Sequence, residues 1–455
     1  MLLYSSQAVA KPYFIAAIAL FAVQVLFGLL LGMQYVMIDI QFITFDAARL
    51  VHTNLLIIWL LFGFMGATYY IIPEESEQEL YNPKLAIQLF WIFLTLTIIT
   101  VLGYSLLPYA TFAKITGNQF FPTMGREYLE QPTIIKLGLL IVLCGFSYNI
   151  AMTVLRGRKG MINLLLLTGI VGTTIVFLFA FYNSSNLIVS KYYRWWLIHF
   201  WIEGTWELIM EAMLAYVIYK ITGDRKVVEK WLYIIVAVTL TTTILGIGHH
   251  YYWIGVPEYW QWIGTIFSVF ELLPFFFMVL FVFNVVNCTK CQYSNKAVKL
   301  WALSTPIMAF LGAGVLGFLH TVAPVNYYSH GTQITSAHGH LAFYSTYVMI
   351  VLTMISYAMP ILRNRKIVNG GLSQRFEILA FWLMTVSMSF MALFIAVAGI
   401  MQVYIQRATD LALPFIEIQN SLMTLYWLRG IGGVIFLIGV IIYIMKFFIA
   451  KGESL

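Results

Sequence analysis

Long uninterrupted apolar stretches are the feature of this 455-residue sequence that most limits how it can fold. A helix needs about 20 consecutive apolar residues to cross the hydrocarbon layer of a membrane. Hydrophobic residues make up 61% of the chain and charged residues 10%, against about 25% charged residues in a soluble protein. This composition excludes a soluble globular enzyme. We expect one all-α polytopic membrane domain over residues 1–455, with about twelve transmembrane helices at 13–36, 50–72, 86–107, 134–155, 161–182, 195–219, 231–251, 261–286, 300–320, 337–361, 378–401 and 421–446.

The basic residues indicate how these helices are oriented. When alternate connections are assigned to opposite sides of the membrane, most of the 26 Lys and Arg residues fall on one side. Cytoplasmic loops carry such an excess, so we expect both termini in the cytoplasm. The formal net charge of +7 comes largely from residues that flank apolar spans beside the lipid bilayer, and we therefore assign no nucleic acid partner.

All eight histidines share one side of this topology. Each lies near the outer end of a predicted helix or in an outer loop. Histidine is a common metal ligand, and haem iron takes axial imidazoles, so we expect one layer of metal or haem chemistry near the outer side. The histidines are His52, His199, His249, His250, His320, His330, His338 and His340.

The pair His338 and His340 is the most informative of these. Successive helical side chains turn by about 100°, so residues two apart point to roughly opposite faces of one helix. One helix could then bind two different cofactors, and Gly339 between the two histidines would let a flat macrocycle approach the backbone. The alternative is a pair of polar residues at a fraying helix end.

Three histidines and a glutamate form a candidate mononuclear metal site. His199 and Glu203 are four residues apart and share one helix face, while His249 and His250 end another predicted helix. A mixed nitrogen and oxygen ligand set suits iron, and the hard carboxylate argues against Cu(I). Zinc remains possible on ligand type alone. An interfacial aromatic belt is the alternative for the histidine pair, but it does not explain the glutamate.

Four glutamates lie inside predicted spans. Glu203, Glu207 and Glu211 repeat every four residues, and Glu271 lies in the eighth span. A charge at the bilayer centre costs about 2.5–3.5 kcal/mol on the insertion scale, so such residues are functional candidates. We expect Glu207 and Glu271 to carry protons or support the metal ligands, and the sequence gives no role to Glu211. Neutral carboxyls packed between helices are the alternative.

Three weaker features lie outside these clusters. Glu127 in the long outer loop could bind a hard cation such as Ca²⁺, or it could simply be solvated. Arg49 lies one turn before His52 and could pair with a haem propionate or anchor the helix at the interface. Cys288 and Cys291 lack the following histidine that covalent haem attachment needs, so we expect no c-type haem on this chain.

Several stretches in combination resemble a known family. They are His52-Thr53-Asn54-Leu55-Leu56, His199-Phe200-Trp201-Ile202-Glu203-Gly204-Thr205-Trp206-Glu207, Gly246-Ile247-Gly248-His249-His250-Tyr251, and the run from His320 through Pro324, Asn326 and His330 to His338-Gly339-His340. This set resembles the catalytic large subunit of the bacterial cytochrome c-dependent nitric oxide reductases, a branch of the haem-copper oxidase superfamily. The resemblance implies a haem-copper oxidase subunit I-like bundle.

The resemblance also implies which residues bind which cofactor. His52 and His340 would be the axial ligands of a low-spin haem b, and His338 the proximal ligand of a high-spin haem b. Glu207 and Glu271 match acidic residues near the metal centre. A non-haem iron facing the second haem would be held by His199, His249, His250 and Glu203, and a calcium that bridges haem propionates by Glu127.

The implied reaction is the reduction of two NO molecules to N₂O and water. Electrons would come from a membrane-anchored cytochrome c subunit, pass through the low-spin haem and reach the centre formed by the second haem and the non-haem iron. Protons would enter from the outer side without pumping. The implied location is a bacterial inner membrane, with the active-site layer toward the periplasm.

Two other functions stay open. An O₂-reducing terminal oxidase of the same superfamily would contain copper and an active-site tyrosine. Glu203 stands where most oxidases have that tyrosine, but Tyr251 and Tyr252 keep this alternative open. A secondary transporter would explain buried glutamates and leaves the histidine layer unexplained.

Overall fold

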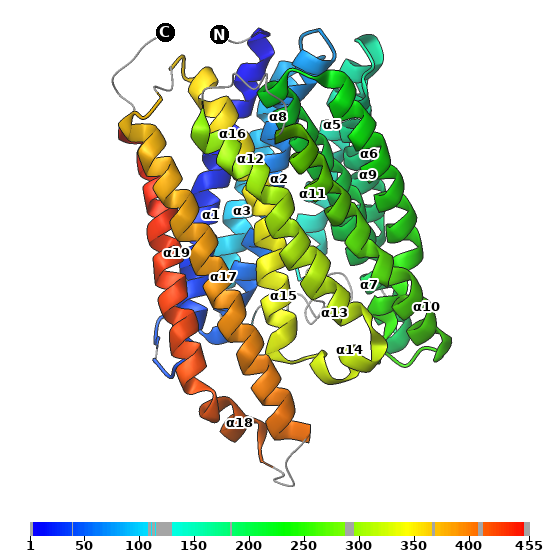
Figure 1. Ribbon diagram of the computed structural model, residues 1–455, viewed down its shortest axis with the longest axis vertical. Helices are drawn as coiled ribbons and strands as arrows, with labels where there is room; N and C mark the ends of the chain where they lie inside the picture. Colours follow the sequence, from blue (N-terminus) through cyan, green and yellow to red (C-terminus); the bar gives the residue numbers. More distant parts are fainter. Residues whose placement is uncertain are drawn as a thin grey trace.

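The computed structural model is a bundle of long helices that run roughly along one direction (Figure 1). It describes residues 3–38, 40–107, 111, 114, 130–182, 184–286, 295–365, 369–407 and 413–449. Among these residues there is no β-strand. The helices that match the first six expected spans are η1 (Ser5–Val9) with α1 (Ala10–Tyr35), α2 (Phe45–Glu75), α3 (Pro83–Leu106), α5 (Thr133–Arg156), α6 (Met161–Phe177) with η2 (Leu178–Phe181), and α7 (Leu187–Phe200) with η3 (Trp201–Trp206) and α8 (Glu207–Thr222).

The second half of the chain continues in the expected order. Its shorter helices α14 (Ala323–Ser329) and α18 (Phe415–Ser421) lie in connections between spans. The helices that match the last six spans are α9 (Arg225–Gly246) with η4 (Ile247–Tyr251), α10 (Tyr259–Ser268) with η5 (Val269–Glu271) and α11 (Leu272–Val286), α12 (Lys296–Ala309) with η6 (Phe310–Val315) and α13 (Leu316–Thr321), α15 (Gln333–Phe343) with η7 (Tyr344–Val348) and α16 (Met349–Leu362), α17 (Leu372–Arg407), and α19 (Met423–Ile449).

The prediction of an all-α membrane protein with about twelve transmembrane helices is confirmed. Eleven helical runs of the described residues are long and apolar enough to cross a membrane. The expected span 195–219 lies in the run formed by α7, η3 and α8, which is less apolar because it carries three glutamates. Some helices exceed the expected spans, since α17 covers Leu372–Arg407 where 378–401 was expected.

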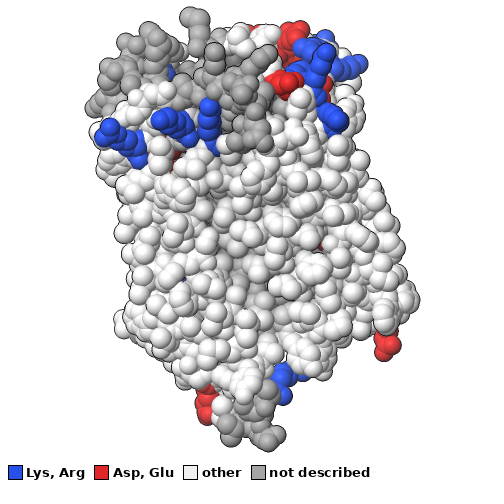
Figure 2. All heavy atoms as spheres, in the orientation of Figure 1, with Lys and Arg blue, Asp and Glu red and all other residues white. Residues whose placement is uncertain are grey.

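Two runs form the centre of the bundle. In α2, 94% of the most apolar window is buried, and in the run from α15 to α16 the share is 78%. In the other spanning runs it is 33–44%, because one face of each helix remains on the outside of the bundle. The visible outer surface is almost free of charge in its middle, and charged side chains gather at its ends, mainly at the end that carries both termini (Figure 2).

The turn between α8 and α9 sets these two helices side by side. Gly223 ends α8 with a φ of +73°, a left-handed conformation that glycine adopts without strain. Asp224 then caps α9, because its Oδ1 accepts a hydrogen bond from the backbone N–H of Val227 at 3.1 Å. This tight reversal directs α9 back along α8, so the two helices can supply one site from both sides.

In the described ranges, three spanning runs contain a short π-helical turn. These turns are η3, η6 and η7, and η3 contains Glu203. A π-turn inserts an extra residue into the helical repeat and changes which side chains face a neighbour, and such turns are frequent at functional sites. They are the first local sign that the middle of this bundle is built around a site.

Candidate metal centre and histidine cavities

A cluster of three histidines and one glutamate lies where the end of α7 and the start of η3 face η4. Single ligand atoms of His199, Glu203, His249 and His250 all lie within 4.8 Å of one another. Oε2 of Glu203 is 3.2 Å from Nδ1 of His199 and 3.7 Å from Nε2 of His249, and its Oε1 is 3.0 Å from Nε2 of His250. The structure therefore brings together all four residues that the sequence analysis assigned to one metal.

Hydrogen bonds on the far side of two rings fix how they face the cluster. Nε2 of His199 donates to the carbonyl oxygen of Thr243 at 2.8 Å, and Nδ1 of His249 donates to that of Gly246 at 2.9 Å. Metal-bound histidines almost always donate their other N–H in this way. Nδ1 of His199 is then left buried without a hydrogen-bond partner beside the carboxylate. An orphaned imidazole nitrogen in such a donor set fits a bound metal ion.

Glu271 lies behind two of these ligands. Its Oε2 is 3.6 Å from Nδ1 of His249, and its Oε1 is 4.0 Å from Nε2 of His199. Gly246 makes this approach possible, since a Cβ at that position would collide with the Glu271 carboxyl. Glu271 could carry protons or support the metal ligands, and this geometry favours support of the ligands.

A cavity of about 480 Å³ adjoins the cluster. Glu207 and His338 line it together with Glu203, His249 and His250 of the cluster. Nδ1 of His338 donates to the carbonyl oxygen of Gly312 in η6 at 3.0 Å, which leaves Nε2 as the nitrogen with a free lone pair. The volume lies within the range of about 300–1,000 Å³ found for ligand and cofactor sites.

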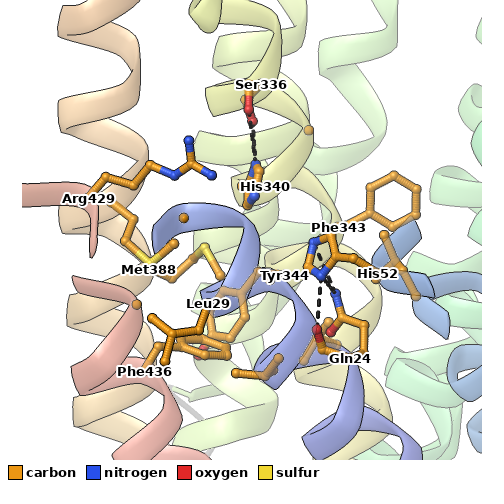
Figure 3. A pocket seen from close by; sticks show the side chains of 18 of the residues that line it. Gln24, Leu29, His52, Ser336, His340, Phe343, Tyr344, Met388, Arg429 and Phe436 are labelled. Atoms are coloured by element: carbon orange, nitrogen blue, oxygen red, sulfur yellow. Dashed lines mark hydrogen bonds between the residues drawn. The ribbon is translucent and has the colours of Figure 1, made fainter. Parts of the chain in front are cut away.

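A second cavity of about 330 Å³ holds His52 and His340 on opposite sides (Figure 3). Their ring centroids are 6.5 Å apart and their planes differ by 28°. Two metal–nitrogen bonds of about 2 Å each and two ring radii of about 1 Å each add up to roughly 6 Å. Nδ1 of His52 donates to the carbonyl oxygen of Gln24 at 2.9 Å, and Nδ1 of His340 to that of Ser336 at 2.7 Å. The spacing and the hydrogen bonds fit two axial ligands of one haem.

An arginine that the sequence analysis missed lines this second cavity. Arg429 of α19 extends toward His340 (Figure 3), and its guanidinium lies 4.6 Å from the ring centroid of Tyr35. Arg49 is described by the structure but is not among the residues that line either cavity. The signal for Arg429 was present, because an arginine inside an apolar span is costly and marks a functional site.

His338 and His340 line different cavities although they are two residues apart. His338 lies in the larger cavity and His340 in the smaller one, while Gly339 borders both. A Cβ added to Gly339 would meet no atom within 4 Å. This arrangement is what the opposite-face argument expects of α15.

The tyrosines that follow the histidine pair do not line the cavity beside the metal cluster. Tyr251 stacks on Tyr192 with ring centroids 4.2 Å apart, and the hydroxyl of Tyr252 donates to the carbonyl oxygen of Thr321 at 2.8 Å. Burial raises the pKa of Tyr252 to about 12. Tyr347 does line this cavity, and its hydroxyl donates to the carbonyl oxygen of Ile202 at 2.6 Å.

The remaining residues singled out in the sequence are one glutamate, two cysteines and two histidines. Glu127, Cys288 and Cys291 fall outside the described residues. His320 and His330 line the larger cavity, and Nδ1 of His320 lies 3.2 Å from Oγ of Ser329.

Comparison with known proteins gives consistent matches over nearly the whole chain. The model of the family "Cytochrome C and Quinol oxidase polypeptide I" matches residues 8–435. A nitric oxide reductase subunit of Stutzerimonas stutzeri is 56% identical over 449 residues, which are 98% of this chain and 95% of that protein. A "Cytochrome c oxidase subunit 1 homolog" of Agrobacterium tumefaciens (strain T37) is 24% identical over 92% of this chain and 78% of that one. A solved haem-copper terminal oxidase superposes with a TM-score of 0.74 at 14% identity, covering 98% of this chain and 85% of the oxidase chain.

Proposed function

Because the chain belongs to the cytochrome c and quinol oxidase polypeptide I family, and within it to the nitric oxide reductases, we propose that it is a catalytic subunit that reduces two NO molecules to N₂O and water. The 56% identical relative carries the nitric oxide reductase name, whereas the named oxidase from Agrobacterium is 24% identical. The structural observation that carries the proposal is Glu203, a carboxylate within 3.7 Å of three imidazoles. A hard oxygen ligand in that set favours iron over Cu(I).

The family implies haem cofactors and a metal centre, and the two cavities suggest their places. We assign a low-spin haem b to His52 and His340 and a high-spin haem b to His338. These groups and the iron would supply electrons and neutralise developing negative charge. The iron would be held by His199, His249, His250 and Glu203.

The chain's own residues hold the ligands in place and bring protons to the cavity. Reduction of two NO to N₂O and water consumes two electrons and two protons, so the site needs proton donors close to the reacting oxygen. Glu207 lines the cavity and is 8% exposed. It is the carboxyl we assign as proton donor, and Glu271 stabilises the orientation of His249.

The partner subunit and the membrane location are also part of this proposal. A membrane-anchored cytochrome c subunit delivers electrons, because the sequence carries no haem c motif and the 56% identical relative is named as one subunit of a larger reductase. The enzyme lies in a bacterial inner membrane, with the basic loops and both termini in the cytoplasm and the histidine layer toward the periplasm. Calcium binding by Glu127 stays a prediction.

A gas-uptake assay tests this function. The purified membrane complex, supplied with reduced cytochrome c, should consume NO and release one N₂O for every two NO. Glu203→Gln should lower this rate at least about tenfold, because it weakens a metal ligand. Glu229→Gln is the matched control. Glu229 lies near the start of α9, away from the end of this helix that contacts the metal cluster, and it pairs with Arg225 at 3.7 Å. Uptake of O₂ without uptake of NO would contradict the proposal.

A further inference from the structure

Glu211 is a buried carboxyl that the metal centre does not use directly. It lies on α8 one turn beyond Glu207, and Glu203, Glu207 and Glu211 occupy successive turns of one helix face. Glu203 and Glu207 line the larger cavity, whereas Glu211 lines neither described cavity and is 2% exposed. An acidic residue in this position needs its own explanation.

The surroundings of Glu211 favour a neutral carboxylic acid. Oγ1 of Thr239 donates a hydrogen bond to Oε1, and Oε2 is buried without a hydrogen-bond partner. No Lys, Arg or His forms an ion pair with Glu211 in the part of the chain that the structure describes. A single neutral donor does not compensate a buried negative charge in a membrane, so the group holds its proton.

Two acidic groups in the described part of the chain interact electrostatically with Glu211. Glu207 is on the same helix, and Tyr347 of η7 interacts electrostatically with both glutamates. The Tyr347 hydroxyl is already committed to the carbonyl oxygen of Ile202. Glu207 is therefore the better candidate to accept the Glu211 proton.

One face of α9 connects Glu211 to the metal ligands. Thr239 and Thr243 lie one turn apart, and both are buried. Oγ1 of Thr243 donates to the carbonyl oxygen of Glu203 at 2.7 Å, and its own carbonyl oxygen accepts from His199. The same face of α9 thus contacts both the turn that carries Glu203 and the turn that carries Glu211.

We propose that Glu211 holds one proton in reserve for Glu207, an inference that rests on the proposed function. Residues four apart on a helix have Cβ atoms about 5–6 Å apart, a gap that one water molecule between the carboxyls can bridge. The buried, unpartnered Oε2 is the atom that such a water would contact. When Glu207 gives its proton to the reacting oxygen, the Glu211 O–H proton passes through the water to Glu207. Glu211 is then a carboxylate only briefly, because the Thr239 hydroxyl alone does not compensate its charge, and the next proton returns to it along the same link.

Infrared difference spectroscopy of the complex tests the reserve proton without NO. Reduction changes the charge near Glu211 and should shift the C=O stretching band of its protonated carboxyl, so reduced-minus-oxidised spectra of the wild type should contain this band. This band should be absent from Glu211→Gln and displaced in Thr239→Val, because that variant removes the hydrogen bond. Thr241→Val is the matched control, since Thr241 is exposed on the same helix. Identical spectra for the wild type and Glu211→Gln in this region would overturn the proposal.

A single-turnover experiment tests the transfer itself. With a pH indicator in solution, the fully reduced wild type should take up one of its two protons later than it reduces NO, because Glu211 supplies that proton first. Glu211→Gln should lose this delay and slow by about tenfold, less than the 10²–10⁴-fold typical of a direct general acid. Equal proton uptake and equal rates in both proteins would overturn the transfer. A wild type that binds haem but reduces no NO would contradict the proposed function instead, and the infrared comparison would still decide whether Glu211 holds the proton.

Discussion

His338 and His340 lie two residues apart on α15, yet they line two different cavities. Each donates its Nδ1–H to a backbone carbonyl, at 3.0 Å for His338 and 2.7 Å for His340. Both rings therefore present Nε2 as a potential ligand atom, on roughly opposite faces of one helix. A single short segment thus presents one histidine to each of the two cavities.

The two histidines should be separable by mutation. We expect His340→Ala to lose the low-spin haem and keep the high-spin one, and His338→Ala to do the reverse, because each cavity contains only one of the two rings. Haem content by pyridine haemochrome and spin state by electron paramagnetic resonance report the result. Equal loss of both haems from each variant would contradict separate sites.

Ser268→Ala should weaken iron binding by about tenfold while the haems remain. Nδ1 of His249 donates to Oγ of Ser268 at 2.9 Å as well as to the carbonyl oxygen of Gly246, and the substitution removes one of these two acceptors. The measurement is the loss of non-haem iron against chelator concentration. Ser389→Ala on the exposed face of α17 is the control, and equal iron retention in both variants would count against this role.

Gly28→Ala should remove the low-spin haem selectively. A Cβ at Gly28 would lie 2.6 Å from Cε1 of His52, so the imidazole must leave its position between α1 and α2. Gly103→Ala in α3 is the matched control, because a Cβ there would meet nothing within 4 Å. Optical spectra of the reduced proteins measure the effect, and a normal low-spin haem signal in Gly28→Ala would show that the site tolerates the shift.

Glu79 anchors η1 through hydrogen bonds from Ser5 and Ser6, and the strength of this anchor should depend on pH. Burial works against ionisation of Glu79, but hydrogen bonds from Ser6 and Ser5 outweigh it and hold the pKa of the carboxyl below its ordinary value. The pKa of Glu79 is therefore lower in the folded protein than in the unfolded chain. The contact stabilises the fold fully at pH values above the unfolded-state pKa, and this stabilisation is lost as pH falls through the folded-state pKa.

Hydrogen exchange measures this anchor. At neutral pH, amide exchange at Ser5 and Ser6 should be slower in the wild type than in Glu79→Gln, because the carboxylate accepts both backbone N–H groups, at 2.9 and 2.8 Å. The difference should disappear in acid below the folded-state pKa. A difference that persists there would contradict the assignment to the ionised carboxylate.

The helix count was predictable because apolar length alone specifies a membrane span. The helix ends were not, since α7 begins at Leu187 rather than at 195 and polar residues continue the helix outside the apolar stretch. The π-turn at Glu203 was also missed, because it depends on packing against α6 and α9 and leaves no local signature.

The clustering of His199, Glu203, His249 and His250 was predictable for a different reason. Imidazoles and carboxylates inside apolar spans are costly, so their presence alone indicated His199, Glu203 and their neighbours. The residues that orient them were missed, because Thr243 and Ser268 are unremarkable in a membrane helix until the fold brings them beside a histidine.

The most direct test of the iron-based account is haem and metal analysis of the purified complex, expressed per mole of this chain. Pyridine haemochrome should give two haems b, and mass spectrometry should give a third, non-haem iron and no copper. Copper in place of the third iron would contradict the account, because Glu203 would then stand in a copper site that its hard carboxylate does not suit.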